Sequence, residues 1–144
     1  MIQTLQQQAA VPPVEKVVRS EDEWRARLSY TQYKVLREKA TELPFSGQLT
    51  WNHDTGIYRC AACGQVIFQS NSKFDSGCGW PSFFQPIGTE AVSEQDDTSL
   101  GMFRIEVVCT GCGSHLGHLF PDGPMPTGMR YCINSAALSF EPTE

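Results

Sequence analysis

Cysteine residues occur twice in the same five-residue arrangement, C-x-x-C-G. The first copy contains Cys60 and Cys63, and the second contains Cys109 and Cys112. Two residues between the thiols let one tight turn present both sulfurs to a single ion, and the Gly that follows tolerates the positive φ of such a turn. Two such pairs form a coordinatively closed tetrahedral site, which suits Zn²⁺. We therefore expect one structural zinc ion, held by these four residues, to join two distant segments.

The spacing leaves other uses of these cysteines open. They could form one or two disulfides, or act as thioredoxin-like redox pairs, although a redox pair is rarely duplicated. Iron also suits a site made of four thiolates. A rival ligand set, which leaves the first C-x-x-C pair without a role, lies within one short stretch: Cys109, Cys112, His115 and His118.

Two further cysteines, Cys78 and Cys132, remain after the metal ligands are assigned. Cys78 lies in a Gly-flanked loop, and Cys132 lies in a β-like segment two residues after Arg130. A neighbouring Arg lowers the pKa of a thiol, and His115 and His118 titrate near neutral pH. This combination indicates a thiol-dependent redox enzyme with a nucleophilic and a resolving cysteine. The competing interpretation is that both thiols are small buried hydrophobic groups.

The elements that must position these residues are short. A capping box at residues 20–23 predicts one helix, and a second helix is predicted at about residues 31–40, ending before Pro44. Apolar, β-branched runs bounded by Gly, Pro, Asn and Asp then predict strands at residues 56–59, 66–68, 102–108 and 137–140. The segment 103–107 alternates apolar and charged residues, as a half-buried antiparallel strand does. We therefore expect a mainly β, mostly antiparallel fold.

Length and composition limit the classes of protein. The chain has 144 residues and a net charge of −5, which suits one domain and argues against nucleic-acid binding. Residues 1–19 lack periodicity and predict a mobile arm, followed by a single domain over residues 20–144. No window is apolar enough to span a membrane, and the N-terminus shows no targeting signal. The expected location is the cytoplasm, where metal binding or catalysis is commoner than disulfides.

Four longer motifs accompany the two C-x-x-C-G pairs. They are PFSG at residues 44–47, KFDSGCGWPSF at 73–83, HLGHLFPDGP at 115–124 and RYCINS at 130–135. Over about residues 20–140 the chain resembles the methionine-R-sulfoxide reductases, in a form that bears zinc. The resemblance implies two antiparallel sheets and thiol-dependent reduction of the R epimer of methionine sulfoxide in proteins.

The resemblance also implies a role for individual residues. Cys132 would attack the sulfoxide and become a sulfenic acid, and Cys78 would resolve it as a Cys78–Cys132 disulfide that thioredoxin reduces. The other matched positions surround the substrate: proton-donating or orienting groups at His115, His118 and Asn134, pocket walls at Trp80 and Phe120, and supporting charges at Asp122 and Arg130. We also expect a monomer, because nothing in the sequence requires more, with one structural zinc ion, no organic cofactor, and no nucleic-acid or membrane partner.

Three functions from other classes also fit part of the sequence. A zinc-ribbon binding module would use the C-x-x-C-G pairs and catalyse nothing. A protein-disulfide oxidoreductase or isomerase would use Cys78 and Cys132, although these do not form the usual C-x-x-C pair. A metalloenzyme would use His115 and His118 as ligands.

Overall fold

The first part of the described chain contains two short helices, α2 (Glu21–Arg27) and α3 (Tyr30–Glu38). The structure is a computed structural model that describes residues 13–143, so residues 1–12 of the predicted arm and Glu144 lie outside the described residues. Ser20 accepts a hydrogen bond from the Glu23 backbone, and the Glu23 side chain accepts one from Ser20 in return, which confirms the predicted capping box.

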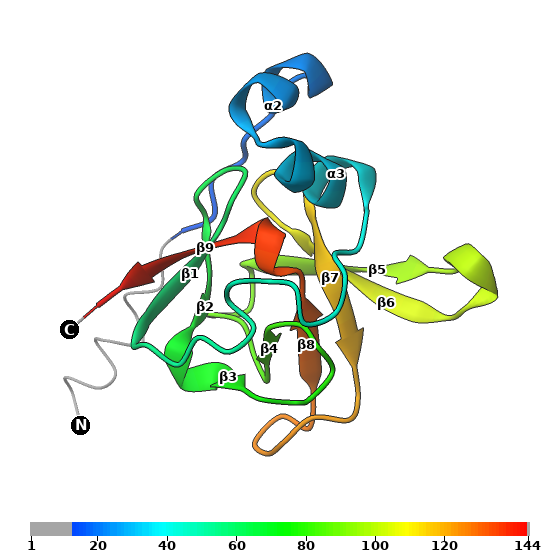
Figure 1. The fold of residues 1–144 in the computed structure, drawn as a ribbon. Coiled ribbons are helices and arrows are strands. Elements are labelled where there is room, and N and C mark those ends of the chain that lie inside the picture. The colour runs from blue at the N-terminus through cyan, green and yellow to red at the C-terminus, as the bar shows by residue number, and fades with distance from the viewer. Residues whose placement is uncertain (1–12, 144) are drawn as a thin grey trace.

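A second capping box, between Ser29 and Gln32, begins α3 one residue earlier than the sequence pattern predicts. The helix ends at Glu38 because Lys39 adopts a left-handed conformation, with φ of 61°. Its apolar face buries Val35 and Leu36 in the core. The two helices lie at one end of the molecule, above the strands (Figure 1).

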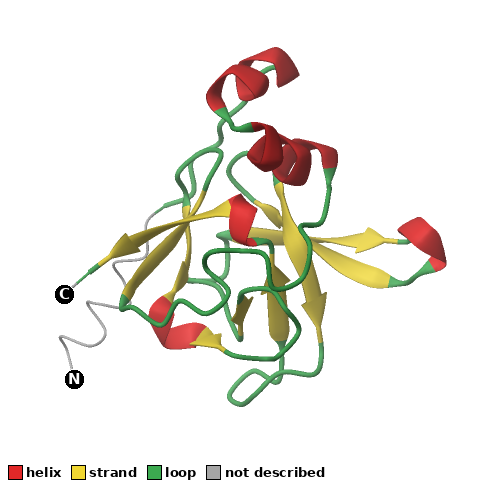
Figure 2. Ribbon diagram, viewed as in Figure 1, coloured by secondary structure: helices red, strands yellow, loops and turns green. Residues whose placement is uncertain are grey.

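The rest of the chain forms two antiparallel sheets, as expected from the family resemblance. The smaller sheet has the order β2-β1-β9, formed by β2 (Val66–Gln69), β1 (Gly56–Cys60) and β9 (Leu138–Pro142). The larger has the order β3-β4-β8-β7-β6-β5, formed by β3 (Lys73–Phe74), β4 (Ser82–Phe83), β8 (Arg130–Ile133), β7 (His115–Phe120), β6 (Arg104–Cys109) and β5 (Val92–Asp97). Long loops and short 3₁₀ turns connect these strands (Figure 2). The mainly β prediction is confirmed.

Aromatic side chains join the two sheets. Tyr58 and Phe68 of the smaller sheet and Phe83 of the larger sheet are fully buried. The Phe68 and Phe83 rings stack at 4.1 Å, and the Tyr58 ring meets the Phe83 ring edge-on at 5.0 Å. Such pairs contribute about 0.5–1.5 kcal/mol each beyond the burial of their area. The core between the sheets therefore fixes β4, which in turn positions β8.

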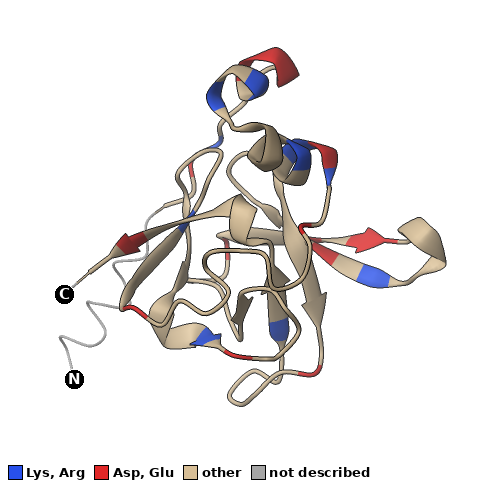
Figure 3. Cartoon of the chain, in the orientation of Figure 1, with Lys and Arg blue, Asp and Glu red and all other residues tan. Residues whose placement is uncertain are grey.

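The β5–β6 hairpin projects from the larger sheet (Figure 1). The sequence pattern does not predict β5, because its residues, VSEQDD, are mostly polar and acidic. Acidic and basic positions both occur on this hairpin and on the two helices, so these elements carry no continuous basic stripe (Figure 3). Among residues 13–143, no helix has the length and apolar character needed to cross a membrane.

Candidate active site and metal site

Two similar turns present the four cysteines of the C-x-x-C-G pairs. Cys60 is the last residue of β1, and Cys109 is the last residue of β6. The Gly64 backbone N–H donates to the Cys60 carbonyl at 2.9 Å, and the Gly113 N–H donates to the Cys109 carbonyl at 2.8 Å. Both Gly residues have positive φ, 85° and 74°, as the sequence predicts for these turns.

The four thiols meet in one cluster. Their sulfur atoms all lie within 4.8 Å of one another, with 3.7 Å between Cys60 and Cys112 and 3.6 Å between Cys63 and Cys109. Hydrogen bonds among the thiols raise the pKa of Cys60 and Cys109 and lower that of Cys63 and Cys112. None of the four forms a disulfide. The cluster is therefore a closed group of soft donors that fits one metal ion.

Residues 15–17, which the sequence assigns to the arm, lie across the second cysteine turn. The Val17 N–H donates to the Gly111 carbonyl at 2.8 Å, and Lys16 Nζ donates to the Thr110 carbonyl at 2.9 Å. A Cβ at Gly111 would lie 2.9 Å from the Glu15 carbonyl oxygen. The Gly between Cys109 and Cys112 therefore allows this segment to approach the turn closely.

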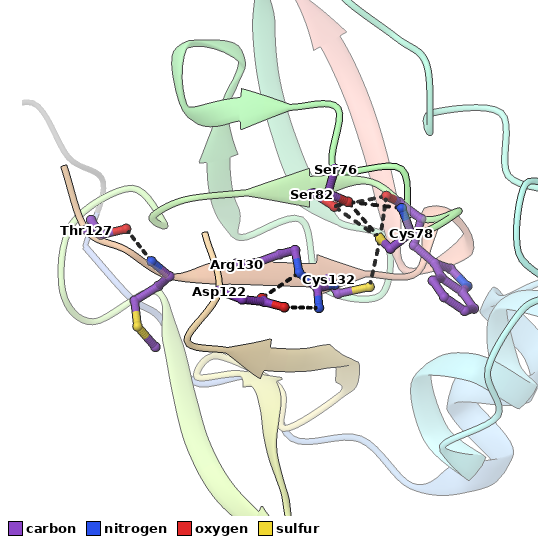
Figure 4. A network of polar contacts seen from close by, with 9 residues as sticks. Ser76, Cys78, Ser82, Asp122, Thr127, Arg130 and Cys132 are labelled. Atoms are coloured by element: carbon purple, nitrogen blue, oxygen red, sulfur yellow. Dashed lines mark hydrogen bonds and ion pairs between the residues drawn. The ribbon is translucent and has the colours of Figure 1, made fainter. Parts of the chain in front are cut away.

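The remaining two cysteines face each other. Cys132 lies in β8, and Cys78 lies in the loop between β3 and β4. Their sulfur atoms are 3.5 Å apart, both residues are half-buried, and both are free thiols (Figure 4). The fold thus brings together two thiols that are 54 residues apart in the sequence.

The two thiols ionise as a coupled pair. The pKa of Cys78 is lowered to about 4, chiefly by a hydrogen bond from Cys132; burial opposes this shift, and hydrogen bonds with Ser76 and Ser82 support it. The same contact raises the pKa of Cys132, and burial adds to this effect. Arg130 lowers the pKa of Cys132, as the sequence suggests, but the contact with Cys78 outweighs it. The pair therefore loses its first proton at a lower pH than a free thiol does, and its second proton at a higher pH.

A small cavity of about 80 Å³ opens beside Cys132. Five of the residues predicted for the site line it: Trp80, His118, Phe120, Cys132 and Asn134. Three further lining residues were missed: Thr41, Arg104 and Gly117. No spacing in the sequence links Thr41 or Arg104 to the motifs, whereas Gly117 lies inside the HLGHLF motif.

Gly117 is required by the packing of β7 on β8. A Cβ at this position would overlap the carbonyl oxygen of Cys132 and lie 2.9 Å from the Ile133 Cα. The missing side chain lets the two strands approach beside the nucleophile candidate. The packing of β7 on β8 therefore requires the Gly of the HLGHLF motif, which the sequence pattern did not reveal.

The two predicted histidines have different environments. His118 lines the cavity, and its Nε2 lies 2.7 Å from Asp97 Oδ2. Arg104 Nη2 contacts the same oxygen at 3.5 Å. Hydrogen bonds from Ser99 and His118 hold the pKa of Asp97 well below its usual value. The β5–β6 hairpin thus supplies the carboxylate that orients His118.

His115 is buried behind His118, with 5.4 Å between the ring centres. Its Nδ1 lies 2.7 Å from Glu106 Oε2, and Glu106 Oε1 accepts from Lys39 Nζ at 3.2 Å. Burial lowers the pKa of His115, and Glu106 opposes this shift. His115 does not line the cavity, so the structure separates the two histidines that the sequence treats alike.

Asn134 and Trp80 are both held by the backbone of Glu42. The Glu42 N–H donates to Asn134 Oδ1 at 3.0 Å, and Trp80 Nε1 donates to the Glu42 carbonyl at 3.0 Å. The Glu42 carboxylate accepts from the backbone N–H groups of Ser135 and Ala136, at 2.8 and 2.9 Å. Glu42 therefore connects three parts of the site, although it lies outside the sequence motifs.

Asp122 and Arg130 support one wall of the cavity. Arg130 Nε donates to Asp122 Oδ1 at 2.8 Å, and Nη2 donates to Oδ2 at 3.2 Å. This pairing lowers the pKa of Asp122. The guanidinium lies 4.4 Å from the centre of the Phe120 ring. Neither charged group lines the cavity itself; Arg130 acts on it through Phe120 and Cys132, and Asp122 acts through Arg130.

Comparison with known proteins places the chain in a family. The SelR domain model matches residues 28–142. The chain is 62% identical over 128 residues to a protein of Bradyrhizobium diazoefficiens, covering 89% of this chain and 92% of that protein. It is 58% identical to one of Methanosarcina barkeri (89% and 90%) and 56% identical to one of Thiobacillus denitrificans (88% and 96%). All three are named peptide methionine sulfoxide reductase MsrB. The chain therefore belongs to the SelR domain family.

Proposed function

We propose that this protein is a peptide-methionine (R)-S-oxide reductase, which reduces the R epimer of methionine sulfoxide in oxidised proteins or peptides. The observation that carries this proposal is the position of the half-buried Cys132. This residue lines an aromatic-walled cavity, and its sulfur lies 3.5 Å from a second thiol. Family membership and the names of the relatives support the same activity.

In the first step Cys132 attacks the sulfoxide sulfur as a thiolate. The pKa of Cys78 lies below that of Cys132, so Cys132 becomes the thiolate when its proton passes to Cys78 across the 3.5 Å contact. His118, which is oriented by Asp97, supplies the proton for the sulfoxide oxygen. The oxygen passes to Cys132 as a sulfenic acid, and methionine leaves. His115 acts from behind His118, and Asn134 orients the oxygen from its fixed position beside Leu116.

The aromatic walls select the substrate. Trp80 is fixed through its indole N–H, so its ring offers an apolar surface to the methyl group of the substrate. Phe120 forms a second wall, and the pair of Arg130 and Asp122 supports it. An apolar methyl site and a polar oxygen site at fixed positions distinguish the two sulfoxide epimers.

In the second step the Cys78 thiolate attacks the sulfur of the Cys132 sulfenic acid. The S–O bond breaks, the hydroxide takes a proton to leave as water, and a Cys78–Cys132 disulfide forms. A disulfide has an S–S length of about 2.05 Å, so the sulfurs approach from 3.5 Å by roughly 1.5 Å. The dithiol of thioredoxin then reduces this disulfide by exchange.

The metal in the four-cysteine cluster is zinc in this proposal. Four sulfurs placed tetrahedrally about 2.3 Å from Zn²⁺ are separated by roughly 3.8 Å. The Cys60–Cys112 and Cys63–Cys109 separations of 3.7 and 3.6 Å are close to that value. The ion would be structural, because its four protein ligands leave no open position for a substrate. Its binding free energy would stabilise only the folded state.

Three further features belong to the proposal. Residues 1–19 form an arm and residues 20–144 form the single catalytic domain. The protein acts as a monomer in the cytoplasm. The reducing environment there keeps its six cysteines available for metal binding and catalysis.

The direct test is turnover of separated R and S epimers of a blocked methionine sulfoxide, first with dithiothreitol and then with thioredoxin. We expect reduction of the R epimer alone with both reductants. If metal-loaded, reduced protein acted on neither epimer, the proposal would fail and a binding module would replace it. Metal analysis of the purified protein should give one zinc per chain, and iron would contradict the choice of metal.

A further inference from the structure

Two serine hydroxyls surround the sulfur of Cys78. Ser76 Oγ lies 2.9 Å from Cys78 Sγ, Ser82 Oγ lies 3.4 Å from it, and the two oxygens are 2.8 Å apart (Figure 4). We propose that Ser76 and Ser82 form a hydroxyl pair that stabilises Cys78 as a thiolate, and that this pair drives the resolving step of the reaction. The role in resolution rests on the proposed function, whereas the stabilisation of the thiolate does not.

The available hydrogens fit this arrangement. Ser76 Oγ accepts from the Cys78 backbone N–H at 3.3 Å and can accept from the Ser82 hydroxyl at 2.8 Å. With both acceptances made, its own hydrogen points to Cys78 Sγ. When the Ser82 hydrogen points to Ser76 and not to the Trp80 carbonyl at 3.2 Å, the result is a chain from Ser82 to Ser76 to the sulfur, in which each hydroxyl strengthens the next donor. In the protonated form the Cys78 S–H instead faces the Trp80 carbonyl oxygen at 3.6 Å.

The hydroxyl pair is held rigidly on one side. Ser82 is buried in β4, directly opposite Cys132 of β8 in the strand register. Ser76 is exposed, at the start of the glycine-flanked turn that carries Cys78. Ser82 therefore holds one side of the hydroxyl pair within the sheet, next to the strand that carries Cys132.

Few other groups act on the charge of Cys78. Cys132 and Arg130, both on β8, are the titratable groups that face it from the neighbouring strand. On its own loop, Asp75 is paired with His53 at 3.2 Å. Once Cys132 becomes a sulfenic acid, its thiol proton is no longer available to Cys78. Ser76 then donates its hydroxyl to the sulfur, and Ser82 supports it through the Ser76 oxygen, at the step in which Cys78 must be a nucleophile.

The stabilisation can be measured without any sulfoxide. In the Cys132→Ala protein, the rate of Cys78 alkylation by iodoacetamide against pH gives the thiolate midpoint, after the zinc-loaded cluster has been shown to be unreactive. We expect Ser76→Ala and Ser82→Ala each to raise this midpoint by about one pH unit, which corresponds to a roughly tenfold loss of thiolate at a fixed pH well below the original midpoint. Ser76→Thr, which keeps a hydroxyl, should restore it. Ser46→Ala, which removes a hydroxyl bonded to the Leu43 carbonyl, is the control.

The role in resolution is measured in protein that retains Cys132. After one equivalent of the R sulfoxide, methionine formation and disulfide formation are followed separately, at a pH below the thiolate midpoint of the parent protein. We expect the ratio of the second rate to the first to fall about tenfold in Ser76→Ala and to recover in Ser76→Thr. An unchanged alkylation midpoint in both Ala variants, or an unchanged ratio, would overturn the inference. Absence of methionine formation by the parent protein would refute the proposed function alone, because the alkylation measurement still decides the state of Cys78.

Discussion

Replacing Glu42 by Gln tests the inference that one carboxylate holds the site together. In the structure this carboxylate accepts two backbone hydrogen bonds, from Ser135 and Ala136, with one oxygen each. Gln keeps one carbonyl oxygen, and its amide nitrogen cannot accept the second bond. A hydrogen bond to a charged group contributes about 1.5–3 kcal/mol. At this chain length a loss of 1 kcal/mol in the free energy of unfolding lowers the Tm by roughly 3 °C, so we expect the Tm to fall by about 5–9 °C.

The assay is thermal unfolding followed by circular dichroism, repeated in urea to confirm the change in free energy. Glu38→Gln is the matched control, because Glu38 makes a partly exposed pair with Lys34 at 2.9 Å. Loss of such a pair costs less than about 1 kcal/mol. A Glu42→Gln protein no less stable than Glu38→Gln would refute the reasoning.

The same variant also separates stability from activity. The Glu42 backbone positions Asn134 and Trp80, and its side chain ties this segment to the residues that follow Asn134. We therefore expect kcat/KM for the R sulfoxide to fall by about tenfold at a temperature where the variant is fully folded, because small misplacements of positioning groups reduce rates strongly. Unchanged kcat/KM would show that the backbone contacts persist without the carboxylate.

Three further predictions follow from the same geometry. Cys132→Ser should abolish methionine formation with every reductant, whereas Cys78→Ser should retain a single turnover and lose recycling by thioredoxin; full thioredoxin-dependent turnover by Cys78→Ser would show that another thiol resolves. Cys60→Ser should yield protein with little metal and low solubility, measured by metal analysis and circular dichroism, and a folded, metal-free, active variant would contradict a structural role for the cluster. Gly117→Ala should lower stability by about 1–3 kcal/mol because its Cβ overlaps the Cys132 carbonyl, and an unchanged Tm would show that β7 and β8 separate without cost.

Local features of this fold were predictable from the sequence. The capping box at Ser20 depends on residues three apart, and the turns of the C-x-x-C-G pairs depend on five consecutive residues. The predicted strands match β1, β2, β6 and β9 to within two residues at each end. Interactions between near neighbours in the sequence determine these elements, so a pattern of residue types is enough to identify them.

Contacts between distant segments were not predictable in the same way. Asp97 lies in β5, a polar strand without apolar alternation, yet its carboxylate contacts His118 of β7. Glu106 alternates with apolar residues like a solvent-facing charge, but it is buried with His115. A charged residue on a strand is expected to face water unless a partner is known, and each of these partners is supplied by another strand.

The strand register explains why the reactive residues meet. Across the larger sheet, Ser82 lies opposite Cys132, Cys132 opposite His118, and His118 opposite Glu106. This row crosses four strands. It places Cys132 between Ser82, one of the two hydroxyls beside Cys78, and His118, which lines the substrate cavity. Successive side chains of a strand alternate between faces, so a shift of one residue between β7 and β8 would turn His118 away from Cys132. The close approach at Gly117, one residue from His118 in β7, opposes such a shift, because any other residue there would collide with β8.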